Sequence, residues 1–78
     1  MIYTEVDSSM IDLVGYDETT QILETRFINT GLTYRYFDVP KEEYERLMKS
    51  SSKGSYMRGY IFDFYDYEKV RGKRRRDW

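Results

Sequence analysis

Residues 22–39 read ILETRFINTGLTYRYFDV, and this run predicts a β-hairpin. The first seven residues alternate between two faces of an extended chain, with Leu23 and Phe27 on one face and Glu24 and Arg26 on the other. Such alternation is typical of a strand with one buried face. The Asn-Thr-Gly tripeptide that follows is typical of a short hairpin connection.

The returning strand of this hairpin, residues 32–39, carries three aromatic rings around one guanidinium. Tyr34 and Tyr36 share one face of this strand, whereas Arg35 and Phe37 point to the other. If the tyrosines faced solvent, their rings could each stack a nucleic-acid base. We favour their burial against a helix, because the apolar face of the preceding strand is their natural partner. Arg35 and Phe37 are then the exposed pair and a candidate contact surface.

The rest of the chain predicts two further strands and two helices. Residues 2–6 and 10–16 are extended segments that end in turn residues. Residues 40–49 begin with the only proline and repeat apolar side chains at helical spacing, so a helix is expected there. A second short helix is expected after Ser52, which would be its N-cap. Residues 62–70 form either a last extended segment or an irregular wrap.

These elements place the chain in the α+β class. We expect a small antiparallel β-meander of three to four strands, packed on one face by two short C-terminal helices. The 78 residues suffice for one small domain, and the absence of cysteine and histidine excludes disulfides and the usual structural zinc site. The nine tyrosines and four phenylalanines must therefore supply much of the buried surface.

The composition argues against catalysis. Without histidine or cysteine, the usual neutral-pH base and the thiolate nucleophile are both missing. The side chains of Asp63, Asp66 and Glu68 could hold Mg²⁺ only if they converged, and a solvated acidic edge is the simpler interpretation. We therefore expect no enzymatic activity, no metal site and no cofactor.

Charge is unevenly distributed along the chain. Residues 69–78 hold six basic and one acidic side chain, whereas the rest hold seven basic and thirteen acidic ones. Arg74, Arg75 and Arg76 would neutralise nucleic-acid phosphates in a salt-sensitive way, and Trp78 could add stacking. A solubilising basic segment is an equally good interpretation of the same residues.

Residues 50–55 read SSSKGS and suit an anion. The hydroxyls of Ser52 and Ser55, the amine of Lys53 and backbone N–H groups at a helix start could together bind a phosphate, with Arg58 nearby. The order of a P-loop is missing, so nucleotide hydrolysis is not implied. The alternative is a linker between helices with a serine cap.

Several motifs follow one another in order along residues 4–65: Val6, Ser8-Ser9, Gly15-Tyr16-Asp17, Tyr34-Arg35-Tyr36, Val39-Pro40, Tyr44, Leu47 and Ser52-Lys53-Gly54-Ser55-Tyr56. Together they resemble the KTSC domain, named after the C-terminal region of some lysyl-tRNA synthetases and also found as small stand-alone proteins of bacteria and phages. The resemblance implies one domain over residues 1–70 and a function that is unsettled, with RNA binding suggested. Residues 71–78 lie outside the resemblance, and we expect them to form a basic, flexible tail.

The sequence departs from this family at one place. Met57 and Arg58 follow Tyr56, where family members commonly carry an aromatic residue and then an asparagine. A ligand site that depends on that asparagine would be altered in this chain.

The favoured function is a non-catalytic accessory module that binds nucleic acid, with RNA preferred over DNA as the partner. Its candidate contacts are Arg35, Phe37, Lys53, Arg58, Arg74, Arg75 and Arg76. Two alternatives stay open: a protein-interaction or self-associating module that uses residues 62–67, and a binder of a nucleotide-like ligand at residues 52–55. The sequence shows no secretory signal pattern and no run that could span a bilayer, so we expect a cytoplasmic location and no membrane partner.

Overall fold

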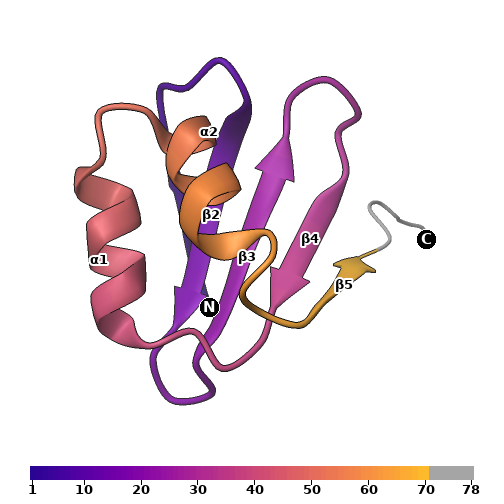
Figure 1. The fold of residues 1–78 in the computed structure, drawn as a ribbon. Helices are drawn as coiled ribbons and strands as arrows, with labels where there is room; N and C mark the ends of the chain where they lie inside the picture. The colour runs from indigo at the N-terminus through magenta and orange to yellow at the C-terminus, as the bar shows by residue number, and fades with distance from the viewer. Residues whose placement is uncertain (71–78) are drawn as a thin grey trace.

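The computed structural model describes residues 1–70, which form an antiparallel sheet with helices on one face (Figure 1). The strands are β1 (Ile2–Glu5), β2 (Ile11–Asp17), β3 (Ile22–Phe27), β4 (Thr33–Tyr36) and β5 (Tyr67–Val70). The helical elements are α1 (Lys41–Lys49), α2 (Lys53–Tyr56) and a π-helical turn, η1 (Met57–Ile61). None of these described helices is long and apolar enough to cross a membrane.

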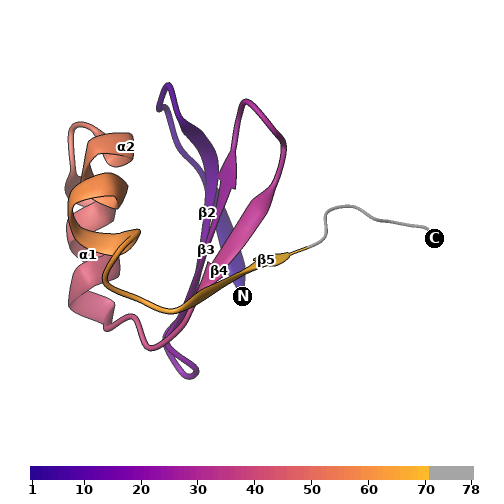
Figure 2. The same ribbon diagram turned by 45° about the vertical axis from the view of Figure 1, so that its right-hand side comes forward.

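The order of the strands in the sheet follows their order in the sequence, from β1 to β5. The chain passes from β1 to β4 through turns, and the helical elements lie between β4 and β5. They form a single layer against one face of the sheet, which Figure 2 shows from the side. The predicted α+β class and the helices on one face are therefore confirmed.

The expected number of three to four strands is wrong, because the sheet has five. The fifth strand is only four residues long, is mostly exposed and has no apolar alternation to mark it. Its extended shape depends on hydrogen bonding to β4, with Tyr67 opposite Tyr36 and Val70 opposite Thr33. Such a strand is defined by its partner rather than by its own residues.

The hairpin of β3 and β4 aligns the predicted apolar faces. Leu23 lies opposite Tyr36, and Thr25 lies opposite Tyr34. This face turns toward the helices, where Leu23 is fully buried and Tyr36 is 2% exposed. Burial of the tyrosine face is therefore confirmed, although Tyr34 is only half-buried.

The core lies between this sheet face and the helical layer. It is formed by eight buried apolar residues, Ile11, Val14, Leu23, Tyr36, Val39, Leu47, Met57 and Ile61. The start of α1 is fixed by two contacts of Tyr16: its ring stacks on that of Tyr44 at 4.6 Å between centroids, and its hydroxyl donates to the Val39 carbonyl at 2.6 Å.

The second helical segment differs from a regular helix. Only the four residues of α2 are α-helical, and the chain then widens into η1, closed by a bond from the Phe62 N–H to the Met57 carbonyl at 2.8 Å. Ser52 is the N-cap residue, as predicted, but its side chain makes no capping hydrogen bond, and its hydroxyl donates to that of Ser55 instead. The wider turn rotates the residues that follow it relative to the core-facing side chains.

Candidate functional site: an aromatic groove

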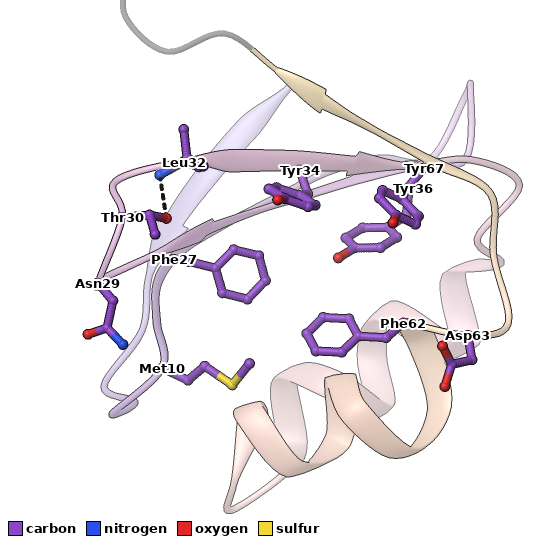
Figure 3. A pocket seen from close by; sticks show the side chains of 10 residues that line it. All are labelled: Met10, Phe27, Asn29, Thr30, Leu32, Tyr34, Tyr36, Phe62, Asp63 and Tyr67. Carbon is purple, nitrogen blue, oxygen red and sulfur yellow. Dashed lines mark hydrogen bonds between the residues drawn. The ribbon is translucent and has the colours of Figure 1, made fainter.

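An open groove lies between the helix-side face of β3, β4 and β5 and the end of η1. Its volume is about 490 Å³. Figure 3 shows the residues that line it: Met10, Phe27, Asn29, Thr30, Leu32, Tyr34, Tyr36, Phe62, Asp63 and Tyr67. We call this feature the aromatic groove, because five of these ten side chains are aromatic.

The five rings of the aromatic groove support one another. Tyr34 meets Phe27 edge to face at 5.4 Å and stacks on Tyr67 at 5.7 Å. Phe62 closes the opposite side, 5.9 Å from Phe27 and 6.4 Å from Tyr36. Offset and edge-to-face contacts of this kind hold aromatic side chains in place. The result is a preformed apolar surface that extends to Tyr67, a residue that is 55% exposed.

Strand geometry explains how these rings come together. Tyr34 and Tyr36 are two residues apart on β4 and share its helix-side face, and the register with β5 brings Tyr67 alongside Tyr36. Phe62 follows directly after η1, so the π-helical turn sets its direction into the groove. With Phe27 at the end of β3, four separate stretches of chain therefore contribute rings to one surface.

Polar groups lie at the ends of the aromatic groove. Asn29 and Thr30 lie at one end and Asp63 at the other (Figure 3). The Thr30 hydroxyl accepts a hydrogen bond from the Leu32 N–H at 3.2 Å, which orders the turn. The guanidinium of Arg58 lies 3.6 Å from the sulfur of Met10, so one cation borders the groove.

The opposite face of the sheet carries a polar row that crosses all five strands. The register aligns Tyr3, Gly15, Glu24, Arg35 and Glu68. Glu24 is 4% exposed and accepts hydrogen bonds from the Tyr3 hydroxyl at 2.6 Å and from Nε of Arg35 at 2.8 Å. Nη1 of Arg35 also reaches Glu68 at 3.1 Å. The guanidinium is thus shared by two carboxylates.

These contacts raise the pKa values of two side chains of the polar row, Tyr3 and Arg35. Burial, followed by the hydrogen bond to Glu24, raises the pKa of Tyr3 to about 12. The hydrogen bond to Glu24 also raises the pKa of Arg35. Arg35 therefore acts as a structural cation. Phe37, its predicted partner, lies on the bend after β4, half-buried, with its N–H bonded to the Asp66 carbonyl at 2.9 Å.

The serine-rich linker before α2 satisfies its own polar groups. Ser52 and Ser55 are joined through their hydroxyls at 3.0 Å, and the Lys53 amine donates to the Ser50 carbonyl at 3.1 Å. The structure therefore brings the three predicted anion ligands together, but their contacts are with one another and with the backbone. Because α2 has only four residues, its dipole adds little to anion binding.

A second polar cluster joins α1 to the segment after η1. Glu43 is 8% exposed, and its carboxylate accepts hydrogen bonds from the hydroxyls of Tyr56 and Tyr65, the latter at 3.0 Å. Nε of Arg46 donates to the Tyr56 hydroxyl at 3.2 Å. Burial, followed by the bond to Glu43, raises the pKa of Tyr65 to about 12. This cluster satisfies a buried charge and has a structural role.

Comparison with known proteins places the chain in a family. A protein-family model described as the KTSC domain matches residues 7–70. The chain belongs to the KTSC domain family. The crystal structure of a KTSC domain protein from Yersinia pestis is similar, with a TM-score of 0.84 and 33% sequence identity, and the match covers 88% of this chain and 96% of that one.

Two kinds of relative, a small protein and a lysine–tRNA ligase, are similar in sequence to this KTSC domain. A protein of Tsukamurella paurometabola is 41% identical over 56 residues, which cover 72% of this chain and 82% of that protein. The lysine–tRNA ligase of Trichormus variabilis is 36% identical over 64 residues, or 82% of this chain. The match spans only 11% of the ligase, so the domain is a small part of that enzyme.

Sequence reasoning placed the candidate surface of this KTSC domain on the other side of the sheet. The exposed pair predicted from the sequence was Arg35 and Phe37, and burial of Tyr34 was favoured over a role in base stacking. The aromatic groove depends on Phe62 and Tyr67, which reach it through the π-helical turn and the late strand pairing. The sequence feature that could have indicated the groove is the density of aromatic residues in 62–67. The sequence analysis instead considered this segment as a contact for another protein.

The remaining predicted contacts divide into two groups. Arg58 is exposed and lies at the edge of the aromatic groove. Arg74, Arg75 and Arg76 lie outside the described residues. Within residues 1–70, no three His, Cys, Asp or Glu side chains come together in a way that could hold a metal ion.

Proposed function

We propose that this KTSC domain is a non-catalytic module that binds single-stranded RNA and holds an unpaired base in the aromatic groove. The observation that carries the proposal is the groove itself, in which Tyr34 and Tyr67 form a continuous stacked surface open to solvent. Readers of single-stranded nucleic acid use such surfaces, because every base has a face that can stack on an aromatic ring.

Cations near the aromatic groove support the proposal. Arg58 borders it through Met10, and Lys69 lies opposite Tyr34 on β5, so its side chain leaves on the groove face. The basic sequence of residues 71–76 continues directly from β5. By contrast, Arg35 on the other face is engaged by two carboxylates. The cations available to bind RNA phosphates therefore lie on the groove side of the sheet.

The charge of the domain predicts how RNA binds. Residues 1–70 contain eight basic and thirteen acidic side chains, so the body as a whole does not attract a polyanion. Contacts with phosphates must be local, through Arg58, Lys69 and the basic segment that follows. Affinity should then be modest and should fall as salt rises.

Two further observations favour RNA and a role without catalysis. Relatives of this chain include lysine–tRNA ligases, whose name gives tRNA as a substrate, and the KTSC domain is a small part of those enzymes. The 78-residue sequence contains no histidine and no cysteine, the side chains most often used for acid–base and nucleophilic catalysis. A cytoplasmic location is part of the same proposal, because RNA is available there.

Fluorescence anisotropy with a labelled single-stranded RNA of about ten nucleotides tests this function. The wild-type chain should bind at about 50 mM salt and bind less tightly at about 200 mM. Tyr67→Ala removes an exposed ring of the groove and should weaken binding about tenfold. Phe64→Ala is the matched control, because Phe64 is 66% exposed and does not line the groove.

Two results would overturn the proposal. The first is an absence of RNA binding at low salt. The second is an equal loss of affinity in Tyr67→Ala and Phe64→Ala, which would show that binding does not depend on the aromatic groove. A single-stranded DNA of the same sequence should bind more weakly if the favoured partner is RNA.

The rival function is docking of a protein, and one observation favours it. A second hollow is lined by residues 62–67, including the exposed Phe64 and the carboxylates of Asp63 and Asp66. An aromatic and acidic surface suits a basic protein partner. Light scattering would reveal self-association, and capture of a protein that survives nuclease treatment would favour this function. A nucleotide-like ligand at residues 52–55 has less support, because those polar groups already bond to one another.

A further inference from the structure

We propose that the aromatic groove selects guanine among the bases of RNA, and that Asp63 is the residue that recognises it. The base stacks on Tyr67, and its N1–H and N2–H groups donate to the carboxylate of Asp63. This inference rests on the proposed function, because it names the base that the RNA presents to the groove.

Asp63 lies where two hollows of the surface meet. Phe62, Asp63 and Tyr67 line the aromatic groove and also the second hollow, which residues 62–67 form. In Figure 3, Asp63 lies at the same end of the groove as Tyr67, and Asn29 lies at the other end. Tyr67 is 55% exposed, so a ring at this end is open to a ligand. A base that stacks on Tyr67 therefore has its edge near the carboxylate of Asp63.

The carboxylate of Asp63 is available to a ligand. Asp63 is exposed and forms no ion pair within residues 1–70. It directly follows Phe62, whose N–H is bonded to the Met57 carbonyl at 2.8 Å, so the π-helical turn fixes the backbone beside it. By contrast, Glu24 and Glu43 are buried and already accept hydrogen bonds from other side chains. Of the ten described residues that line the groove, only Asp63 carries a charged side chain.

A carboxylate is better suited to guanine than to the other bases. It only accepts hydrogen bonds, and its two oxygens can accept two parallel ones. Guanine presents N1–H and N2–H side by side on its Watson–Crick edge. Adenine and cytosine place a ring nitrogen with a lone pair beside the amino group, and uracil places its N3–H between two carbonyl oxygens. The carboxylate therefore attracts guanine through two hydrogen bonds and repels an acceptor on each of the other three bases.

The charges around the groove favour a nucleotide over a basic side chain of a protein, which could also bind Asp63. Arg58 borders the groove through Met10, and Lys69 lies opposite Tyr34 with its side chain on the groove face. These cations repel a basic peptide and attract the phosphates on either side of a base. The carboxylate is therefore matched to a group that donates hydrogen bonds without carrying a positive charge, as guanine does.

Fluorescence anisotropy with a series of RNAs tests the selection. Each RNA has about ten nucleotides, all uridine except for one central position that carries guanine, adenine, cytosine or uracil. The wild-type chain should bind the guanine RNA about tenfold more tightly than the adenine RNA. Inosine, which lacks the N2 amino group, should weaken binding about threefold relative to guanine. 7-Deazaguanine keeps both donors and should bind as guanine does.

A matched pair of variants tests the role of Asp63. Asp63→Asn replaces one acceptor with a donor and should remove the preference for guanine over adenine. Asp66→Asn makes the same change of charge, but Asp66 lines only the second hollow, so the preference should stay at about tenfold. The ratio of the two affinities is the measure, because the loss of a negative charge strengthens binding of every RNA. Circular dichroism checks that both variants are folded.

The outcomes separate this inference from the proposed function. If the wild-type chain binds RNA through Tyr67 with equal affinity for the four bases, guanine selection is wrong and the proposed function stands. An equal loss of preference in Asp63→Asn and Asp66→Asn would also overturn the role of Asp63.

Free nucleosides supply a test that does not need RNA binding. Saturation-transfer difference NMR should detect guanosine on the wild-type chain, with a weaker signal for adenosine and for guanosine on Asp63→Asn. A chain that binds guanosine in this way but binds no RNA would contradict the proposed function and keep the selection by Asp63. An absence of both signals would overturn both.

Discussion

Gly15, which has no side chain, allows the polar row to cross the sheet. The ring of Tyr3 lies over Gly15, so that a Cβ atom at this position would stand 2.6 Å from two of the ring carbons. This close approach lets the Tyr3 hydroxyl reach the buried carboxylate of Glu24. Glycine in a strand interior is otherwise unfavourable, and here its absence of a side chain permits the contact.

The first prediction concerns this contact. Gly15→Ala should displace the Tyr3 ring, break its hydrogen bond to Glu24 and lower the free energy of unfolding by about 1–2 kcal/mol. Urea unfolding measures the change. Gly59→Ala is the control, because a Cβ atom there has nothing within 4 Å and the residue lies in η1, so stability should stay the same or rise by about 0.5 kcal/mol. Equal losses in the two variants would contradict the proposed contact.

A second prediction concerns the two carboxylates that share Arg35. Arg35→Ala leaves the buried Glu24 without its cation and should lower the free energy of unfolding by about 2–3 kcal/mol. Glu68→Ala removes the exposed partner, whose side chain is 55% exposed, and should cost less than about 1 kcal/mol. If Glu68→Ala were the more damaging change, the ion pair of Arg35 with Glu24 would not be the one that stabilises the sheet.

At the scale of elements, Glu43 links α1 to the rest of the helical layer. Its carboxylate accepts from one tyrosine in α2 and from another, Tyr65, in the segment that leads to β5. That segment also forms the edge of the aromatic groove through Phe62 and Asp63. The position of the groove wall therefore depends on a polar contact that lies outside the groove.

The third prediction follows from this link. Glu43→Ala should lower the free energy of unfolding by about 2–3 kcal/mol, because two half-buried hydroxyls lose their acceptor. Glu45→Ala, an exposed change on the same helix, should stay within about 0.5 kcal/mol of wild type. Thermal unfolding followed by circular dichroism compares the two. A stable Glu43→Ala variant would show that packing alone holds the helical layer.

At the scale of the whole molecule, the described domain has no histidine to respond near neutral pH, and its titratable tyrosines respond in alkali. The pKa values of Tyr3 and Tyr65 are raised from the ordinary value of 10.0 to about 12, in both cases first by burial and then by a hydrogen bond to a carboxylate. The folded state therefore holds these protons more tightly than the unfolded state does.

The fourth prediction is the resulting pH dependence. The stabilisation from both hydroxyls should be fully present below pH 10 and should be lost as the pH rises through about 12. Urea unfolding at several alkaline pH values measures the decline. Tyr3→Phe removes one ionising hydroxyl and should make the decline shallower. An identical slope in wild type and Tyr3→Phe would contradict the raised pKa of Tyr3.

Short-range sequence patterns were enough to predict the fold class of this protein and the buried face of its sheet. Alternation in β3 and β4, the turn between them and the helical spacing of α1 are short-range properties, and they predicted the α+β class and the buried tyrosine face. Each depends on residues within about one element, which the sequence displays directly.

Only the tertiary structure decided where the candidate site lies. The pairing of β5 with β4, the π-helical turn before Phe62 and the shared guanidinium of Arg35 all join residues that are far apart in the chain. A strand of four mostly exposed residues has no pattern of its own, and an arginine on a strand does not reveal which carboxylates will neutralise it. Those outcomes depend on register and packing across the sheet, so they moved the candidate surface from Arg35 and Phe37 to the aromatic groove on the other side.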